Sequence, residues 1–276
     1  MSLTRVTTSA ELTTYRYVRF ALLALLLALA ISVAAETVRG GWQTSISAYY
    51  YTAAGPVFIG ALTAIGVCLV ALRGFTDAED VCLNLAGVSA PMVAFVPTPE
   101  EGRLPDVPAI VNNALTYLAV LAVGYLVVLL AVRRQPGRPT PWGIAGLVLT
   151  AAAWLVGVTW VLADRDSFAA HAHALAAVFT FLPFAGVVVL NTDWGVRHLA
   201  REASASPTRL DGAYWSIVAG MAAVCVVFAL AHAWRFALLG TEVGLLALFA
   251  LFWGLRLIDD RGGEASRSGM GAMPIM

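Results

Sequence analysis

Eight apolar stretches alternate with polar segments along the chain, at residues 18–38, 56–72, 81–97, 109–132, 142–163, 170–190, 214–234 and 238–257. A helix of about 20 mostly apolar residues crosses the ~30 Å hydrocarbon core of a bilayer. The pattern therefore predicts an all-α bundle of about eight transmembrane helices. The third stretch fits least well, because it is short and carries Asn84, Ser89 and Pro91.

The arginines indicate which way the helices cross. If the N-terminus lies in the cytoplasm, 13 of the 17 arginines fall on the cytoplasmic side and four, Arg39, Arg103, Arg165 and Arg235, on the outer side. Cytoplasmic loops normally carry the excess of basic residues. We therefore expect both termini inside, a cytoplasmic N-terminal segment at 1–17, one transmembrane bundle at 18–257 and a flexible cytoplasmic tail at 258–276. Removing the third span would destroy this alternation.

Composition supports a lipid environment and excludes several function classes. Hydrophobic residues make up 60% of the 276 residues and charged residues only 12%, which is too few to cover a soluble protein of this size. The net charge is zero, so we expect no nucleic-acid partner. All basic residues are arginine, which is typical of a GC-rich prokaryotic genome. We expect a plasma (cytoplasmic) membrane protein whose partners are membrane lipids and other membrane subunits.

Polar side chains within or beside membrane spans are expensive and are therefore candidates for function. On the predicted outer side, the run Ser-Ile-Ser-Ala-Tyr-Tyr-Tyr-Thr at 45–52 stands out. Its tyrosines either form an aromatic belt at the membrane interface or pack inward and cover a cavity. The candidate ligand-binding residues on this side are Glu36, Ser45, Ser47, Tyr49, Tyr50, Tyr51, Asn112, Asn113 and Glu242.

Three histidines, His171, His173 and His232, lie on the same predicted side and suggest a metal site. Three imidazoles and a water form a common catalytic zinc site, with Asp164 or Glu242 as general base. His171 and His173 are about 200° apart on a helix, so they reach one ion only if the sixth helix starts after His171. Haem between His173 and His232 is the less favoured cofactor. The alternative is that these histidines bond to backbone or water at helix ends.

On the predicted inner side, Asp77, Glu79, Asp80 and Asn84 gather where the third span starts. Acidic residues stabilise a helix N-terminus by offsetting its dipole. A proton or cation site is the alternative, because Asp80 and Asn84 are four residues apart and share a helix face.

The 45–52 run resembles an uncharacterised family of prokaryotic multi-span membrane proteins. The segments 57–62, 64–66, 79–80, 85–87 and the one that begins at His173 are similar to it as well. In layout, a Ser-Ile-Ser motif before a Val-Phe span is also similar to the Frag1/DRAM-type membrane proteins. These resemblances imply a multi-span fold and supply no activity. A further similarity is to the alkaline ceramidase and progestin-receptor-like hydrolases, which place Ser, Asp and three His around zinc; their helical histidine pair at i, i+4 is missing here.

Three functions stay open at this point. The first is a non-enzymatic protein that binds a lipid or small apolar ligand or serves as an accessory subunit. The second is a metal-dependent membrane hydrolase that uses the three histidines. The third is a secondary transporter coupled through Asp80 or Glu242, which would require an ionisable residue near the middle of the membrane.

Overall fold

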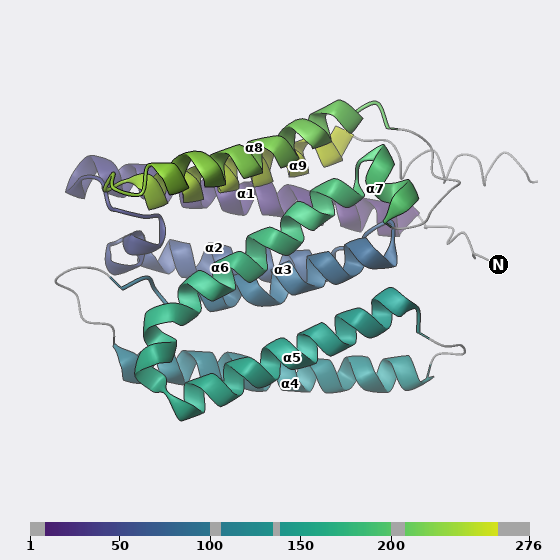
Figure 1. Ribbon diagram of the computed structural model, residues 1–276, viewed down its shortest axis with the longest axis horizontal. Coiled ribbons are helices and arrows are strands. Elements are labelled where there is room, and N and C mark those ends of the chain that lie inside the picture. Colours follow the sequence, from purple (N-terminus) through teal and green to yellow (C-terminus); the bar gives the residue numbers. More distant parts are fainter. Residues whose placement is uncertain (1–8, 100–105, 135–138, 200–207, 259–276) are drawn as a thin grey trace, which may run out of the picture.

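The structure, a computed structural model, describes residues 9–99, 106–134, 139–199 and 208–258, and within them every regular element is helical (Figure 1). The predicted tail at 258–276 falls, beyond its first residue, outside these ranges. The elements are α1 (Ser9–Gly40), the 3₁₀ turn η1 (Ser47–Tyr51), α2 (Gly55–Ala71), α3 (Asp77–Phe95), α4 (Val107–Arg134), α5 (Pro141–Ala163), α6 (Arg165–Leu190), α7 (Asp193–His198), α8 (Asp211–Leu230) and α9 (Ala237–Ile258).

Each predicted apolar stretch coincides with one long helix, and the differences lie at the ends. α1 starts at Ser9, inside the segment assigned to the cytoplasm, and α6 starts at Arg165 rather than at residue 170. Asp164 explains the earlier start of α6, because its side chain accepts the backbone N–H of Ser167 and so caps the helix. The short elements η1 and α7 were not predicted.

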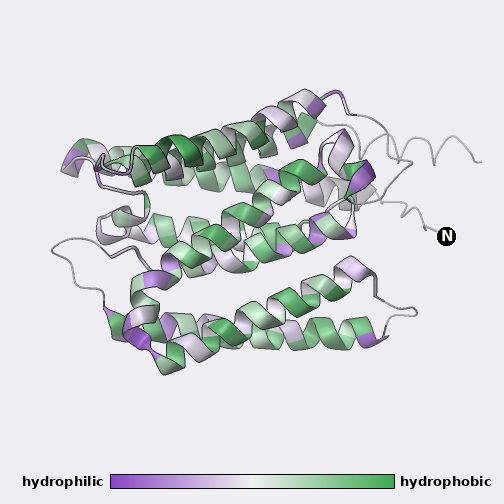
Figure 2. Cartoon of the chain, in the orientation of Figure 1, coloured by the Kyte–Doolittle hydropathy of each residue, from purple (hydrophilic) through white to green (hydrophobic). Residues whose placement is uncertain are grey.

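Six of the described helices are long and apolar enough to cross a membrane: α1, α4, α5, α6, α8 and α9. α2 is apolar but has only 17 residues, and α3 carries three acidic residues in its first turn. Figure 2 shows the apolar residues along the helices and hydrophilic residues gathered toward their ends. The chain is thus a helical protein with six helices suited to crossing a membrane, while crossings by α2 and α3 stay a prediction.

The long helices lie side by side and divide the bundle into two ends (Figure 1). The start of α1, the end of α9 and the short helix α7 lie at one end, called here the α7 end. The turn η1 and the start of α4 lie at the opposite end, called the η1 end. A hydrogen bond from Arg19 Nη1 to the Arg256 carbonyl, 3.0 Å long, joins α1 to α9 at the α7 end.

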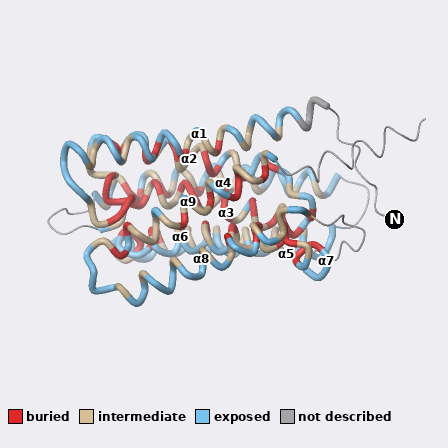
Figure 3. The backbone as a smooth tube through the Cα atoms, turned by 90° about the horizontal axis from the view of Figure 1, so that it is seen from above, coloured by how far each residue is buried: buried red, intermediate tan, exposed pale blue. Residues whose placement is uncertain are grey.

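The main core fills the space between α1, α2, α3, α6, α8 and α9. Figure 3 shows the buried segments along the middle of the molecule and exposed segments around them. α2 and α3 approach closely where Gly66 faces Gly87: a Cβ added at Gly66 would lie 2.6 Å from the Gly87 carbonyl oxygen. Small residues permit such backbone contact, which is a main source of helix association in lipid.

The α4–α5 hairpin packs differently, since its buried residues are concentrated at the η1 end. There a second core joins Leu118 of α4 and Val161 of α5 to Phe168 of α6. Toward the α7 end, α4 has no buried residue after Leu118, and Val161 is the one buried residue within α5. Toward the α7 end, a Cβ added at Gly146 of α5 would lie 2.7 Å from Val81 Cγ2 of α3, so α5 stays in contact with α3 there.

Candidate functional site

A cavity of about 1050 Å³ lies between the α4–α5 hairpin and the helices α3 and α6. Its wall on α5 runs from Thr140 near the α7 end to Trp160 near the η1 end. At a rise of 1.5 Å per residue, these 20 residues correspond to a length of about 30 Å. The cavity extends along the helices, which suits an extended chain better than a compact molecule.

Most side chains that line the cavity are apolar, and the polar ones are concentrated on α3. Asp77, Asp80, Asn84 and Ser89 follow one another at intervals of three to five residues along the face of α3 that borders the cavity. The opposite face of α3 is buried in the bundle. Asp80 and Asn84, which are four residues apart, both line the cavity.

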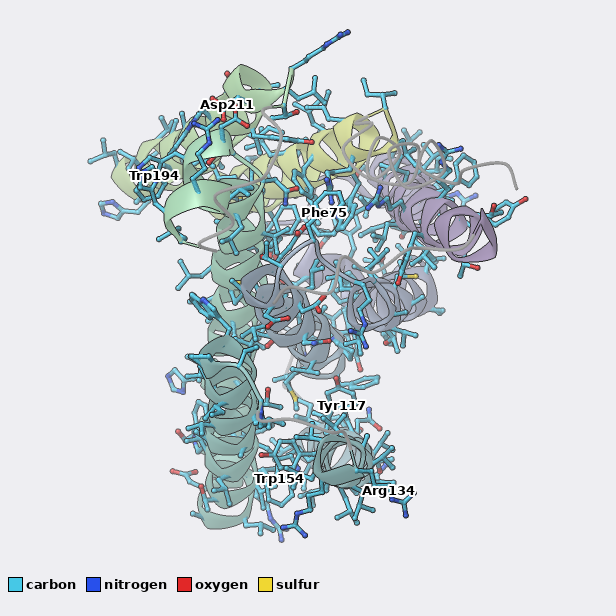
Figure 4. All side chains as sticks on the ribbon, turned by 90° about the vertical axis from the view of Figure 1, so that its right-hand side faces the viewer. Phe75, Tyr117, Arg134, Trp154, Trp194 and Asp211 are labelled. Carbon is cyan, nitrogen blue, oxygen red and sulfur yellow. The ribbon has the colours of Figure 1, made fainter. Side chains whose placement is uncertain are left out.

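Hydrogen bonds from aromatic side chains fix the hairpin around the cavity. Tyr117 Oη on α4 donates to the Val88 carbonyl of α3 at 2.8 Å, and Trp154 Nε1 on α5 donates to the Leu118 carbonyl of α4 at 2.7 Å. Figure 4 looks along the bundle from the α7 end and shows Tyr117 between α4 and α3. These bonds satisfy the polar atoms of both rings while their apolar surfaces face the cavity.

The predicted outer residues form a separate cluster at the η1 end, the η1 cluster, made of Ser45, Ser47, Thr98 and Glu242. The Glu242 carboxylate accepts the backbone N–H of Ile46 at 2.5 Å and the Ser47 hydroxyl at 3.4 Å. The Ser47 hydroxyl also contacts those of Ser45, at 3.0 Å, and Thr98, at 2.5 Å. These polar groups therefore form hydrogen bonds with one another, and those bonds connect η1 to the start of α9.

The tyrosines and the remaining outer candidates do not cover the cavity. Tyr49 is fully buried and its hydroxyl bonds to Thr37 of α1, while Tyr51 Oη donates to the Thr98 carbonyl at 3.3 Å. Asn112 Nδ2 donates to Asn113 Oδ1 at 3.4 Å. None of the predicted outer ligand-binding residues lines the cavity: Glu36, Ser45, Ser47, Tyr49, Tyr50, Tyr51, Asn112, Asn113 and Glu242.

The three histidines are not brought to one point. Within the described ranges, no three His, Cys, Asp or Glu side chains are placed to hold a metal ion together. Because α6 starts at Arg165, His171 and His173 both lie within it and face different sides. His171 is exposed, and His173 is buried with Nδ1 2.6 Å from the carbonyl of Val96, the residue that follows α3. His232 follows the end of α8 and contacts the Ala229 carbonyl. The zinc arrangement expected from these three residues is absent from the described structure.

Glu79 separates from its acidic neighbours and forms a buried cluster at the α7 end, called the Glu79 cluster. Its carboxylate accepts the Phe75 backbone N–H at 2.8 Å and Asn191 Nδ2 at 2.9 Å, and lies 3.6 Å from Arg256 Nη2. Glu79, Asn191 and Arg256 are each at most 2% exposed, and the Arg256 guanidinium also lies over the Phe75 ring. This cluster joins α3, α6 and α9, so Glu79 has a structural role.

Sequence reasoning identified Asp77, Asp80 and Asn84 but missed the aromatic and α6 side of the cavity. Tyr117, Trp154 and Trp160 lie inside apolar stretches that lipid-facing helices also contain, so only the packing of α4 and α5 reveals their position. Comparison of the chain with protein-family models, curated proteins and solved structures gave no match. The family resemblances stay predictions, and the functional argument rests on the cavity.

Proposed function

We propose that this chain is a non-enzymatic plasma-membrane protein that holds one extended apolar chain, that of a membrane lipid, in the cavity between α3, α4, α5 and α6. The observation that carries the proposal is the shape of this cavity, about 1050 Å³ in volume and about 30 Å long. That length matches the thickness of the hydrocarbon core. Lipid binding sites are mostly apolar with a few polar groups that set orientation, which is the distribution found here.

In this proposal all eight long helices cross the membrane, with the α7 end in the cytoplasm. An even number of crossings agrees with the start of α1 and the end of α9 lying at the same end (Figure 1). Described arginines near the α7 end are Arg16, Arg19, Arg73, Arg133, Arg134, Arg197, Arg209 and Arg256, against Arg39, Arg165 and Arg235 near the η1 end. This excess supports a cytoplasmic α7 end. In this proposal α2 and α3 cross the membrane largely covered by neighbouring helices. Because polar residues in a membrane are tolerated where they face the interior of a bundle, this position accommodates the polar residues of α3.

Bound lipid can be counted by native mass spectrometry of protein released from gentle detergent, with a variant that fills the cavity. Gly124 of α4 lines the cavity, and an added Cβ would meet no atom within 4 Å, so Gly124→Phe should fold. Gly60 of α2 offers the same open space but does not line the cavity, which makes Gly60→Phe the matched control.

We expect a lipid adduct of about one per chain on the wild type and on Gly60→Phe, and its loss on Gly124→Phe. Extraction and chromatography of the released lipid would identify the chain. Equal adducts on all three proteins would place the lipid elsewhere on the surface and contradict the proposal. The absence of any retained lipid on the wild type would contradict it as well.

A further inference from the structure

We propose that the short helix α7 binds anionic phospholipid headgroups at the surface of the membrane, through an exposed face made of Trp194, Arg197 and His198, called here the α7 face. Along the chain, α7 (Asp193–His198) lies between α6 and α8, which are both long and apolar enough to cross a membrane. It starts three residues after α6 ends, so it lies where the chain leaves the hydrocarbon core. No residue of α7 lines the cavity, so this surface is separate from the proposed lipid-chain site.

The residues of α7 divide into a covered side and an exposed side. Gly195 and Val196 are buried, and a Cβ added at Gly195 would collide with the Val189 carbonyl of α6. The residues of the α7 face are exposed, and their spacing of three and four residues places them on one side of the helix. The rings of Trp194 and His198 stack with their centroids 5.4 Å apart. The α7 face therefore combines an aromatic surface with a guanidinium group.

Hydrogen bonds fix the direction in which the α7 face points. Thr192 Oγ1 accepts the Gly195 backbone N–H at 2.9 Å and caps the helix. The Asp193 backbone N–H donates to Asp211 Oδ1, in the first turn of α8, at 2.7 Å. In turn, Asp193 Oδ1 accepts the Thr208 backbone N–H at 2.9 Å. Because α7 is held against the start of α8, its exposed face is ordered before any lipid binds.

Trp194 points away from the centre of the bundle, toward the lipid that would surround it. Figure 4 looks along the bundle from the α7 end and shows Trp194 at the outer edge. Its ring centroid lies 6.4 Å from that of Trp215, near the start of α8, and the two residues are 48% and 39% exposed. Trp142, at the start of α5, is exposed at the same end. Tryptophan favours the headgroup level of a bilayer, so these rings mark the depth of that level.

The exposed charges beside Trp194 are positive. Arg197 is exposed and forms no ion pair with a described residue. Arg209, next to the residue that bonds to Asp193, is exposed as well. The carboxylates of Asp193 and Asp211 accept backbone N–H groups of this region instead. A guanidinium binds phosphate oxygens through parallel charge-assisted hydrogen bonds, so an anionic phosphate group is the complement of this surface.

The exposed indoles favour a lipid as the source of that phosphate. A free phosphate ion satisfies an arginine but makes no use of an apolar ring beside it. A phospholipid headgroup is attached to an apolar layer, so its phosphate reaches the arginines while the indole rests at the edge of the hydrocarbon. Arginines near a membrane surface are attracted by anionic lipids and much less by zwitterionic ones.

The test measures hydrogen exchange of the backbone amides at residues 191–199 by mass spectrometry, in the full-length protein in nanodiscs. Discs of phosphatidylcholine alone are compared with discs that also contain phosphatidylglycerol. Each arginine at an anionic surface contributes about fivefold to binding. We therefore expect exchange in the wild type to slow by about fivefold or more in the phosphatidylglycerol discs, because the bound helix opens less often. High salt should weaken this effect.

The double variant Arg197→Gln/Arg209→Gln should reduce the phosphatidylglycerol effect to less than about twofold. The double variant Arg133→Gln/Arg134→Gln is the matched control. It removes the same charge from two exposed arginines in the last turn of α4, which ends at the α7 end as well. This control should keep the full effect. Inorganic phosphate added to the phosphatidylcholine discs should leave the exchange of α7 unchanged.

Three results would overturn the proposal. Equal exchange of the wild type in both kinds of disc would show that α7 does not respond to anionic lipid. Slowing that persists in Arg197→Gln/Arg209→Gln, or that is lost equally in the control, would assign the effect to overall charge rather than to the α7 face. Slowing by inorganic phosphate would show that a free anion is sufficient and that the partner is not the lipid.

Discussion

Replacement of Glu79 by glutamine tests whether the Glu79 cluster stabilises the folded helix bundle. The carboxylate of Glu79 accepts two hydrogen bonds, from Phe75 N–H and Asn191 Nδ2, and faces the Arg256 guanidinium at 3.6 Å. Glutamine keeps the shape and one acceptor oxygen but removes the negative charge. An amide NH₂ group takes the place of the second oxygen, and this group donates hydrogen bonds but cannot accept them. At least one of the two hydrogen bonds to Glu79 is therefore lost.

The expected loss of stability follows from the burial of Glu79 and Arg256. Glu79 and Arg256 are each 2% exposed, so water cannot replace the missing carboxylate. Breaking a buried ion pair by removing one partner typically costs about 3–5 kcal/mol. We therefore expect Glu79→Gln to lower the free energy of unfolding by about 3–5 kcal/mol. Asn191→Ala should cost about 1.5–3 kcal/mol, because it removes one hydrogen bond to a charged group and leaves the ion pair.

The assay is reversible unfolding in mixed micelles of a mild detergent and sodium dodecyl sulfate, followed by tryptophan fluorescence. Arg73→Gln is the control, because the Arg73–Asp80 pair at the same end is 4.0 Å long and the Arg73 side chain is 59% exposed. It should change stability by less than about 1 kcal/mol. A cost below about 1 kcal/mol for Glu79→Gln would refute the reasoning. Equal costs for the buried and the exposed pair would refute it too.

Three further substitutions address other parts of the bundle and use the same unfolding measurement. His173→Ala should cost about 1–3 kcal/mol because it leaves buried carbonyl groups of α3 unpaired, whereas His171→Ala, on the exposed side of α6, should change stability by less than about 0.5 kcal/mol. Gly66→Leu should cost more than about 2 kcal/mol because a side chain there meets the backbone of α3, and Gly60→Leu on the same helix should be tolerated. Glu242→Ala should cost about 1–3 kcal/mol by leaving a backbone N–H of the η1 segment unpaired; a cost below about 0.5 kcal/mol would mean that the η1 cluster does not hold that segment.

The helices could be predicted from the sequence because one physical requirement dominates them. A segment that crosses lipid must satisfy its backbone internally and expose apolar side chains, so length and hydropathy locate it. That requirement explains why α4 and α5 were placed to within a few residues. It also explains why α3 was the weakest prediction: its acidic first turn and Asn84 face a cavity and the Glu79 cluster rather than lipid.

The site could be predicted only in part, because depth in the membrane does not determine which residues meet. Glu242 and the Ser45–Ser47 run share the η1 end and do contact each other, as a structural cluster. His171 and His173 share the same depth but point to different sides of α6, which depends on where that helix starts. The cavity is lined by residues of four helices, α3, α4, α5 and α6, and no pattern within a single helix encodes how these helices pack together.

The most direct test of the account is a structure of the protein in phosphatidylethanolamine-containing nanodiscs, determined by electron cryomicroscopy. We expect elongated density of one apolar chain between α3, α4, α5 and α6, along the cavity from Thr140 to Trp160. An α4–α5 hairpin closed onto α3 and α6, with no space between them, would contradict the account.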